Sequence, residues 1–178
     1  MTKNINSKNK GSGFERKIAN LLSTRFESKL GIKNGFRRNA DSGAFFGSSN
    51  KQRMQTYSLD YALFGDIVCP RNFRFSIECK HYKTPPTFKS LISQSVTQWD
   101  TWLKQAEQDA VSSNKCMSLI VKYNNVDPII FLQQEISGII HNTYQQYHIH
   151  LLADWLSLDD LHFFETDDAI DITHTSIV

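Results

Sequence analysis

The sequence predicts an α/β fold in which a mixed sheet of about five strands is flanked by two helices. Two stretches carry apolar residues at helical spacing, and short runs rich in β-branched and aromatic residues lie between and after them. The chain has 178 residues, 40% of them hydrophobic and 21% charged, which is enough to bury a core without disulfides. This composition excludes a disordered, collagenous or coiled-coil protein.

The first helix is expected over residues 13–28. Ser12 and Glu15 stand in the S-x-x-E spacing of a capping box, immediately before an amphipathic stretch. The apolar face of that stretch consists of Phe14, Ile18, Leu21, Leu22 and Phe26. Residues 1–12 are rich in Asn, Lys and Ser, so we expect them to form a flexible basic arm.

A long loop and two strands are expected next. The twenty residues after Ser42-Gly43 read as a loop, and a loop of this length is either functional or mobile. The strands are predicted at Asp66–Cys69 and Phe73–Lys80, joined by turn residues 70–72. Strict alternation in the second strand puts its apolar and its polar residues on opposite faces.

The register of this hairpin decides whether its charged residues meet. If three residues form the turn, Asp66 lies opposite Ser76, on the same face as Glu78 and Lys80. A four-residue turn would send Asp66 to the other face.

The remaining elements are a long helix and three strands with a short helix. The long helix is expected over about 87–112, and the strands over 118–123, 129–132 and about 147–151. A short helix is expected around residues 153–164. We divide the chain into a basic arm (1–12), a core (13–132) and a C-terminal extension with an acidic tail (133–178).

Charge is distributed unevenly along the chain. Residues 1–90 contain 17 Lys and Arg against 6 Asp and Glu, residues 91–150 contain 3 against 5, and residues 151–178 contain none against 7. The overall net charge of +2 therefore conceals a basic half and an acidic tail. A basic half is typical of a nucleic-acid-binding face, and the alternative is a lysine-rich solvated surface.

Several classes of protein and site are not indicated. No apolar run approaches a membrane span and the start lacks a signal peptide, so we expect a cytoplasmic protein without membrane contact. Cys69, Cys79 and Cys116 show no CxxC spacing, which argues against a disulfide framework or a thiolate zinc site. His148 and His150 share a strand face, but no Cys or His at ligand spacing joins them, so zinc is not predicted.

Two carboxylates and a lysine on one strand face point to a metal site. Asp66 and Glu78 would repel each other, and Lys80 could neutralise only one of them. The same set suits Mg²⁺, which prefers hard oxygen ligands and can acidify a bound water into a nucleophile. We therefore expect Mg²⁺, with Mn²⁺ as a possible substitute.

The segment from Asp66 to Glu78-Cys79-Lys80 resembles the D…(E)-x-K signature of the PD-(D/E)XK nuclease superfamily. Flanking residues strengthen the likeness, because four segments resemble, in order, the motifs of archaeal-type Holliday-junction resolvases. These segments are Lys10–Arg16, Arg37–Gly43, Gly65–Val68 and Ile77–Lys80. The chain departs from that family in an insertion at Asn50–Gly65, in lacking Pro before Asp66, and in residues 133–178.

The resemblance implies a restriction-endonuclease-like fold and a Mg²⁺-dependent endonuclease that resolves four-way DNA junctions as a homodimer, without a small-molecule cofactor. It implies catalytic roles for Glu15, Ser42, Asp66, Glu78 and Lys80. It implies metal ligation by Asp66, Glu78 and the Cys79 carbonyl, with Glu15 as a further candidate. The candidate DNA contacts are Lys10, Arg37, Arg38, Lys51, Arg53 and Lys83.

Two rival functions remain open at this point, and a third alternative is a soluble protein in which these charges form a surface salt-bridge cluster. One is a PD-(D/E)XK nuclease acting on other DNA in restriction, repair or end processing, possibly from a virus or mobile element. The other is a non-catalytic DNA-binding protein on the same fold. The intact Asp66, Glu78 and Lys80 set argues against the second.

Overall fold

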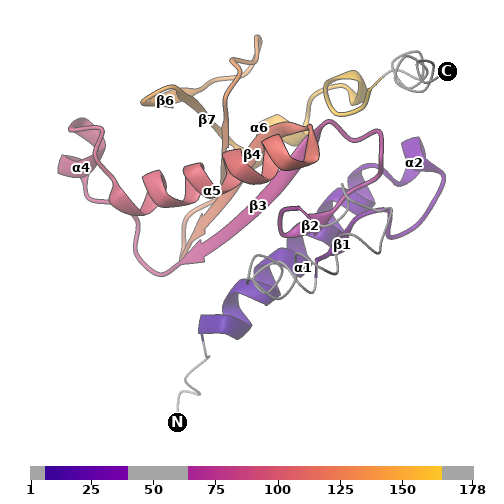
Figure 1. The fold of residues 1–178 in the computed structure, drawn as a ribbon, viewed down its shortest axis with the longest axis horizontal. Helices are drawn as coiled ribbons and strands as arrows, with labels where there is room; N and C mark the ends of the chain where they lie inside the picture. The colour runs from indigo at the N-terminus through magenta and orange to yellow at the C-terminus, as the bar shows by residue number, and fades with distance from the viewer. Residues whose placement is uncertain (1–6, 40–63, 166–178) are drawn as a thin grey trace, which may run out of the picture.

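The computed structural model describes residues 7–39 and 64–165, which form a five-stranded mixed sheet with helices on both faces (Figure 1). The strand order is β3-β4-β5-β7-β6, in which only β3 and β4 are parallel. The strands are β3 (Phe75–Tyr82), β4 (Cys116–Tyr123), β5 (Ile129–Leu132), β6 (Asn142–Tyr144) and β7 (Tyr147–Leu151). The predicted fold class is confirmed, and β3 forms one edge of the sheet.

The first helix is longer than the sequence predicts. α1 (Ser7–Arg25) begins six residues before the expected start and is followed by α2 (Glu27–Leu30). Ser12 lies inside α1, where its carbonyl and hydroxyl accept hydrogen bonds from Arg16 at 3.0 and 3.3 Å. The predicted capping box and the arm boundary at residue 12 are therefore wrong, because the polar first turns of α1 carry no apolar periodicity to mark them.

The predicted long helix is two helices, α4 (Phe88–Ile92) and α5 (Thr97–Ser113). The break contains Gln94, whose φ of 50° ends the helical path. The Gln94 side chain accepts a hydrogen bond from the backbone N–H of Gln145 at 2.5 Å, in the turn between β6 and β7. A tertiary contact thus overrides the helical pattern.

Both faces of the sheet are buried. One core, formed by α1, α6 (Leu152–Leu156) and the residues after it, covers Ile77 and Cys79 on β3. The other core, formed largely by α5, covers Leu119 and Val121 on β4. The polar face of β3 therefore lies under α5 rather than in solvent.

The predicted pairing of residues 66–69 with 73–80 is wrong. β2 (Ile67–Val68) pairs antiparallel with β1 (Arg37–Arg38) in a separate two-stranded sheet. The predicted turn does form, since the N–H of Phe73 donates to the Pro70 carbonyl at 3.0 Å. The chain then continues into β3 without pairing to β2 as a ladder.

Residues 133–165, assigned from the sequence to an extension, share the sheet and the core with the preceding residues. β7 pairs with β5, and Trp155, Phe163 and Phe164 are buried in the core that α1 covers. The predicted helix at 153–164 consists of α6 and a single 3₁₀ turn, η2 (Asp160–His162). Within the described residues, no helix has the length and apolar character to cross a membrane.

Candidate active site at the free edge of β3

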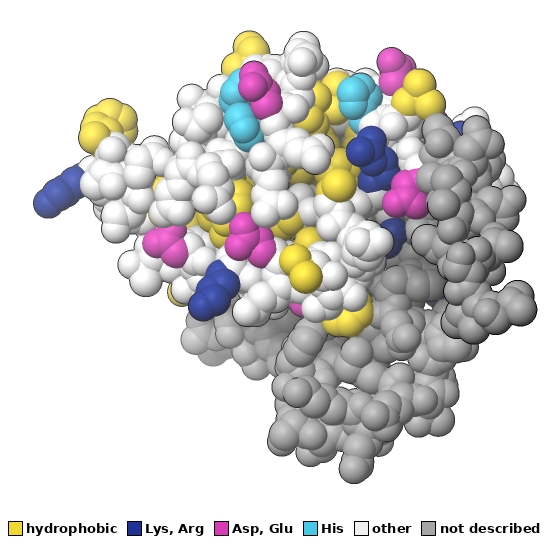
Figure 2. All heavy atoms as spheres, turned by 45° about the horizontal axis from the view of Figure 1, so that its top comes forward, with side chains coloured by type: hydrophobic (Ala, Val, Ile, Leu, Met, Phe, Trp, Pro, Cys, Tyr) yellow, Lys and Arg dark blue, Asp and Glu magenta, His cyan; other side chains and the backbone are white. Residues whose placement is uncertain are grey.

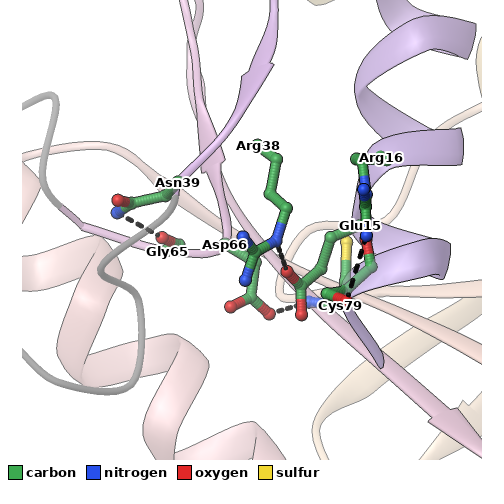
Figure 3. A network of polar contacts seen from close by, with 8 residues as sticks. Glu15, Arg16, Arg38, Asn39, Gly65, Asp66 and Cys79 are labelled. Atoms are coloured by element: carbon green, nitrogen blue, oxygen red, sulfur yellow. Dashed lines mark hydrogen bonds and ion pairs between the residues drawn. The ribbon is translucent and has the colours of Figure 1, made fainter. Parts of the chain in front are cut away.

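Asp66 lies against the free edge of β3 and is held there by two hydrogen bonds, of which Figure 3 shows the one with Cys79. Its backbone N–H donates to the carbonyl of Ile77, and its Oδ2 accepts from the N–H of Cys79, both at 2.8 Å. The side chain is 7% exposed. Asp66 therefore contacts β3 through one backbone and one side-chain hydrogen bond, without the continuous hairpin ladder that the sequence predicts.

The position before Asp66 requires glycine. Gly65 has a φ of +77°, and a Cβ atom there would lie 2.7 Å from the Ile77 carbonyl oxygen. Proline is restricted to a φ near −65° and cannot adopt this conformation. The absence of Pro at this position, a departure from the resolvase motif, thus follows from how closely this backbone approaches β3.

Glu78 and Lys80 project from β3 toward α5. Lys80 Nζ donates to Glu78 Oε1 and also to Gln105 Oε1 on α5, the latter at 3.1 Å. The Glu78 side chain is 2% exposed, whereas the Lys80 side chain is 23% exposed. The lysine therefore links a buried carboxylate to the surface.

The cluster of Asp66, Glu78 and Lys80 contains more negative than positive charge. Burial, and after it the charge of Asp66, raises the pKa of Glu78 to about 8, although Lys80 opposes the shift. Burial disfavours the charge on Lys80, but Glu78 outweighs it and raises the lysine's pKa. One lysine does not compensate both carboxylates.

Asp109 on α5 is a third carboxylate of the cluster, and the sequence does not predict it. Burial and then Asp66 raise its pKa to about 6, while Lys80 and a hydrogen bond from the Gly65 backbone lower it. Its spacing from Ala106 and Ala110 is a signal, because it places Asp109 on the buried stripe of α5. Gln105, which accepts a hydrogen bond from Lys80, is exposed on α5, and its spacing carries no such signal.

Glu15 and Arg38 approach the edge of β3 from the side of α1. Arg38 Nε donates to Glu15 Oε2 at 2.5 Å, and the Glu15 side chain is 13% exposed. Figure 3 shows the side chains of Glu15, Arg38 and Asp66 converging beside the backbone of Cys79. The structure therefore brings Glu15, Asp66, Glu78 and Lys80 to one strand edge from three separate segments.

The donor atoms at this edge fit a divalent cation such as Mg²⁺. Asp66 and Glu78 offer carboxylate oxygens whose charge is incompletely neutralised, as the raised pKa of Glu78 indicates. The Cys79 N–H faces Asp66, and the carbonyl of a strand residue points toward the same edge as its N–H. In residues 7–39 and 64–165, however, no three His, Cys, Asp or Glu side chains are arranged to hold a metal.

A cavity of about 420 Å³ with three lysines in its lining lies on the α1 side of the sheet, the face opposite to Glu78 and Lys80. Lys10, Lys17, Lys122 and His81 contribute to its lining. Burial and then Lys10 lower the pKa of His81, and Lys122 and Lys17 act in the same direction. None of these lysines pairs with a described carboxylate, so the cavity is suited to bind anions.

The predicted DNA contacts have mixed placements. Lys10 lines the cavity and donates to Asn124 Oδ1 at 2.8 Å. Arg37 and Lys83 are exposed, whereas Arg38 is engaged by Glu15. Ser42, Lys51 and Arg53 lie outside the described residues.

Comparisons with known proteins identify the family of this chain. The model of a family described as phage putative PDDEXK endonuclease matches residues 6–165, which include the segment 133–165. Among solved structures, the chain is similar to Hjc, a Holliday junction resolvase from Archaeoglobus fulgidus. That similarity has 16% identity and a TM-score of 0.39 over 89% of this chain and 96% of Hjc. No curated protein matches the sequence.

Proposed function

The chain belongs to the phage putative PDDEXK endonuclease family, and on this premise we propose that it is a Mg²⁺-dependent endonuclease selective for branched DNA, such as a four-way junction. The observation that carries this proposal is the meeting of Asp66, Glu78 and Lys80 at the free edge of β3. The order of the sequence motifs supports the choice of a junction as substrate.

Asp66, Glu78 and the Cys79 carbonyl would hold the metal ion, with Mn²⁺ as a substitute. When bound, Mg²⁺ supplies an acidified water and neutralises charge on the scissile phosphate. The chain's own residues do the positioning. The Cys79 N–H fixes the Asp66 carboxylate, and Gln105 and Glu78 together orient the Lys80 ammonium.

Lys80 is proposed to stabilise the charge that develops on the phosphate in the transition state. Its raised pKa keeps it protonated at neutral pH, and its partly exposed side chain can reach a bound strand. Glu15 and Ser42 are proposed as further catalytic residues. Glu15 would act beside the Cys79 backbone, where Arg38 holds it.

DNA binding is proposed to use phosphate contacts, which give affinity without reading sequence. The cavity lined by Lys10, Lys17, His81 and Lys122 is proposed to bind DNA backbone on the α1 face of the sheet. Arg37, Lys51, Arg53 and Lys83 are proposed as additional contacts. A two-fold dimer would place two such sites for paired cuts in one junction.

The test compares a four-way junction with a linear duplex of the same sequence, each with Mg²⁺ or with EDTA. The wild type is expected to make paired symmetric nicks in the junction only when Mg²⁺ is present. Asp66→Asn and Lys80→Ala are expected to cut at least about 100-fold more slowly while retaining DNA binding. Circular dichroism of each variant controls for folding.

Other outcomes separate the rivals. Equal cutting of duplex and junction would favour a restriction, repair or end-processing nuclease, which the phage description of the family makes the second candidate. Binding without cutting by the wild type in Mg²⁺ and in Mn²⁺ would identify a non-catalytic DNA-binding protein.

A further inference from the structure

Three histidines gather at the edge of the sheet opposite to β3. His148 and His150 alternate on β7, so their side chains share a face. His141 immediately precedes β6, the edge strand that pairs with β7. The ring centroid of His141 lies 5.0 Å from that of His148 and 5.5 Å from that of His150. The pairing of β6 with β7 thus supplies the third histidine that sequence spacing does not predict.

The hydrogen bonding of His150 assigns its protons. Its Nδ1 lies 3.3 Å from the carbonyl oxygen of Ile140, which can only accept, so Nδ1 carries the proton and Nε2 carries the lone pair. His150 is 1% exposed, and its Nε2 is buried without any hydrogen-bond partner. A lone pair aimed into the interior with no donor is costly for the folded state.

The Nδ1 of His148 is likewise buried and has no hydrogen-bond partner. The described residues contain one other such side-chain atom, Nε1 of Trp155, which lies in the aromatic core. Two orphaned imidazole nitrogens beside a third imidazole are acceptors that one shared ligand would satisfy.

A transition-metal ion satisfies these nitrogens. Neutral imidazole is a preferred ligand of Zn²⁺, and ligating histidines usually donate their second N–H to a carbonyl or carboxylate. His150 shows that pattern with Ile140. Glu135 Oε1 lies 3.8 Å from His141 Nε2, which is too far for a hydrogen bond but places a carboxylate beside this ring.

The spacing of the His141 ring from the other two rings is close to that of a metal site. Three imidazoles bound tetrahedrally at about 2.0–2.1 Å have ring centres about 5 Å apart. In the structure, the ring nitrogens do not converge within bonding distance of one point. Metal binding therefore requires at least one of the three rings to rotate. His141 can turn, because its side chain is 25% exposed and it lies outside regular structure.

We propose that His141, His148 and His150 bind one Zn²⁺ ion, with water in the fourth position. The ion would fasten the segment between β5 and β6 to β7, and so act on structure rather than on cleavage. The His141 and Glu135 side chains are 25% and 65% exposed, so an ion can approach this cluster from solvent, and Figure 2 shows histidine and acidic side chains together at the surface. The site is independent of the proposed nuclease function.

The test is a Co²⁺ and Zn²⁺ titration of the untagged, EDTA-treated full chain. One equivalent of Co²⁺ is expected to give the visible absorption band of a tetrahedral site, and Zn²⁺ should abolish the band and raise the melting temperature. His141→Ala should lower the affinity at least tenfold, whereas His162→Ala, an exposed histidine on η2, should leave it unchanged.

His141→Ala is the informative variant, because His150→Ala removes a buried side chain and tests folding as well. Asp66→Asn with Glu78→Gln should keep the band, which separates this site from the candidate active site. The proposal is overturned by the absence of saturable binding, by equal binding in His141→Ala, or by loss of the band in the Asp66/Glu78 variant.

Discussion

The Asp66 carboxylate accepts a hydrogen bond at 2.8 Å from the backbone N–H of Cys79, the residue between Glu78 and Lys80. This bond ties a residue from an irregular segment directly to the strand that carries the other two charged groups. The position of Asp66 relative to Glu78 is therefore fixed by the backbone of β3.

The buried carboxylates should make stability fall as pH rises. Burial and Asp66 raise the pKa of Glu78 from 4.5 to about 8, so between these values the folded chain keeps a proton that the unfolded chain has released. The free energy of unfolding then decreases with pH across this window. Asp109, raised from 3.8 to about 6, contributes in the same direction at lower pH.

Urea denaturation in EDTA at pH 5, 6.5 and 8 measures this effect. Glu78→Gln should flatten the dependence, and Glu135→Gln, an exposed carboxylate, should not. Adding Mg²⁺ at pH 8 should raise the free energy of unfolding of the wild type, because an ion bound by the carboxylates stabilises the folded chain. An unchanged pH slope in Glu78→Gln would refute the assignment.

Gly65→Ala should destabilise the chain by about 3 kcal/mol or more, because it combines an unfavourable φ with a clash against the Ile77 carbonyl. Gly138→Ala is the matched control. Its φ is +88° but a Cβ there meets nothing within 4 Å, so about 1–2 kcal/mol is expected from φ alone. Equal losses in urea denaturation would show that the close approach to β3 is unimportant.

Glu15 and Arg38 should be energetically coupled. Their side chains are 13% and 31% exposed, so a double-mutant cycle with Glu15→Gln and Arg38→Gln is expected to give about 0.5–1 kcal/mol. Glu15→Gln combined with Asp160→Asn provides an additive control, since Asp160 pairs with Arg25. Additivity in both cycles would mean that Arg38 does not hold Glu15.

Lys17→Ala should weaken DNA binding at low salt and lower the slope of log K against log salt by about 1, the value for one phosphate contact. The reason is that Lys17 lines the cationic cavity without a salt-bridge partner among the described carboxylates. Lys29→Ala, on α2 and outside the cavity, serves as the control. Fluorescence anisotropy at several salt concentrations would show equal slopes if the cavity binds no DNA.

Much of this architecture can be predicted from the sequence. Helical and strand periodicity predict the mixed sheet, and the D…E-x-K pattern predicts that Asp66, Glu78 and Lys80 meet. The route by which Asp66 arrives is not predictable from turn length, because β2 pairs with a two-residue strand, Arg37–Arg38, that has no periodicity of its own. Two hydrogen bonds, one from the Asp66 backbone and one to its side chain, then hold Asp66 against β3 in place of the expected hairpin ladder.

Other parts depend on contacts between segments that lie far apart in the chain. Asp109 reaches the site only because α5 packs on the polar face of β3, and a buried stripe containing one acidic residue reads as an ordinary helix face. His141 joins His148 and His150 through the pairing of β6 with β7. Local spacing places Asp109 on a buried helix face, but it does not show which residues Asp109 or His141 contact.

The two ends of the described chain are joined in one core, since the Phe26 ring lies 4.8 Å from Phe163 and 5.2 Å from Phe164. Arg25 at the end of α1 also donates to the carbonyls of Leu156 and Leu158 at 2.8 Å. The packing of α1 is therefore complete only when residues up to Phe164 are present. Because α1 carries Glu15, a chain truncated before Phe163 is expected to lose contacts that position this residue beside β3.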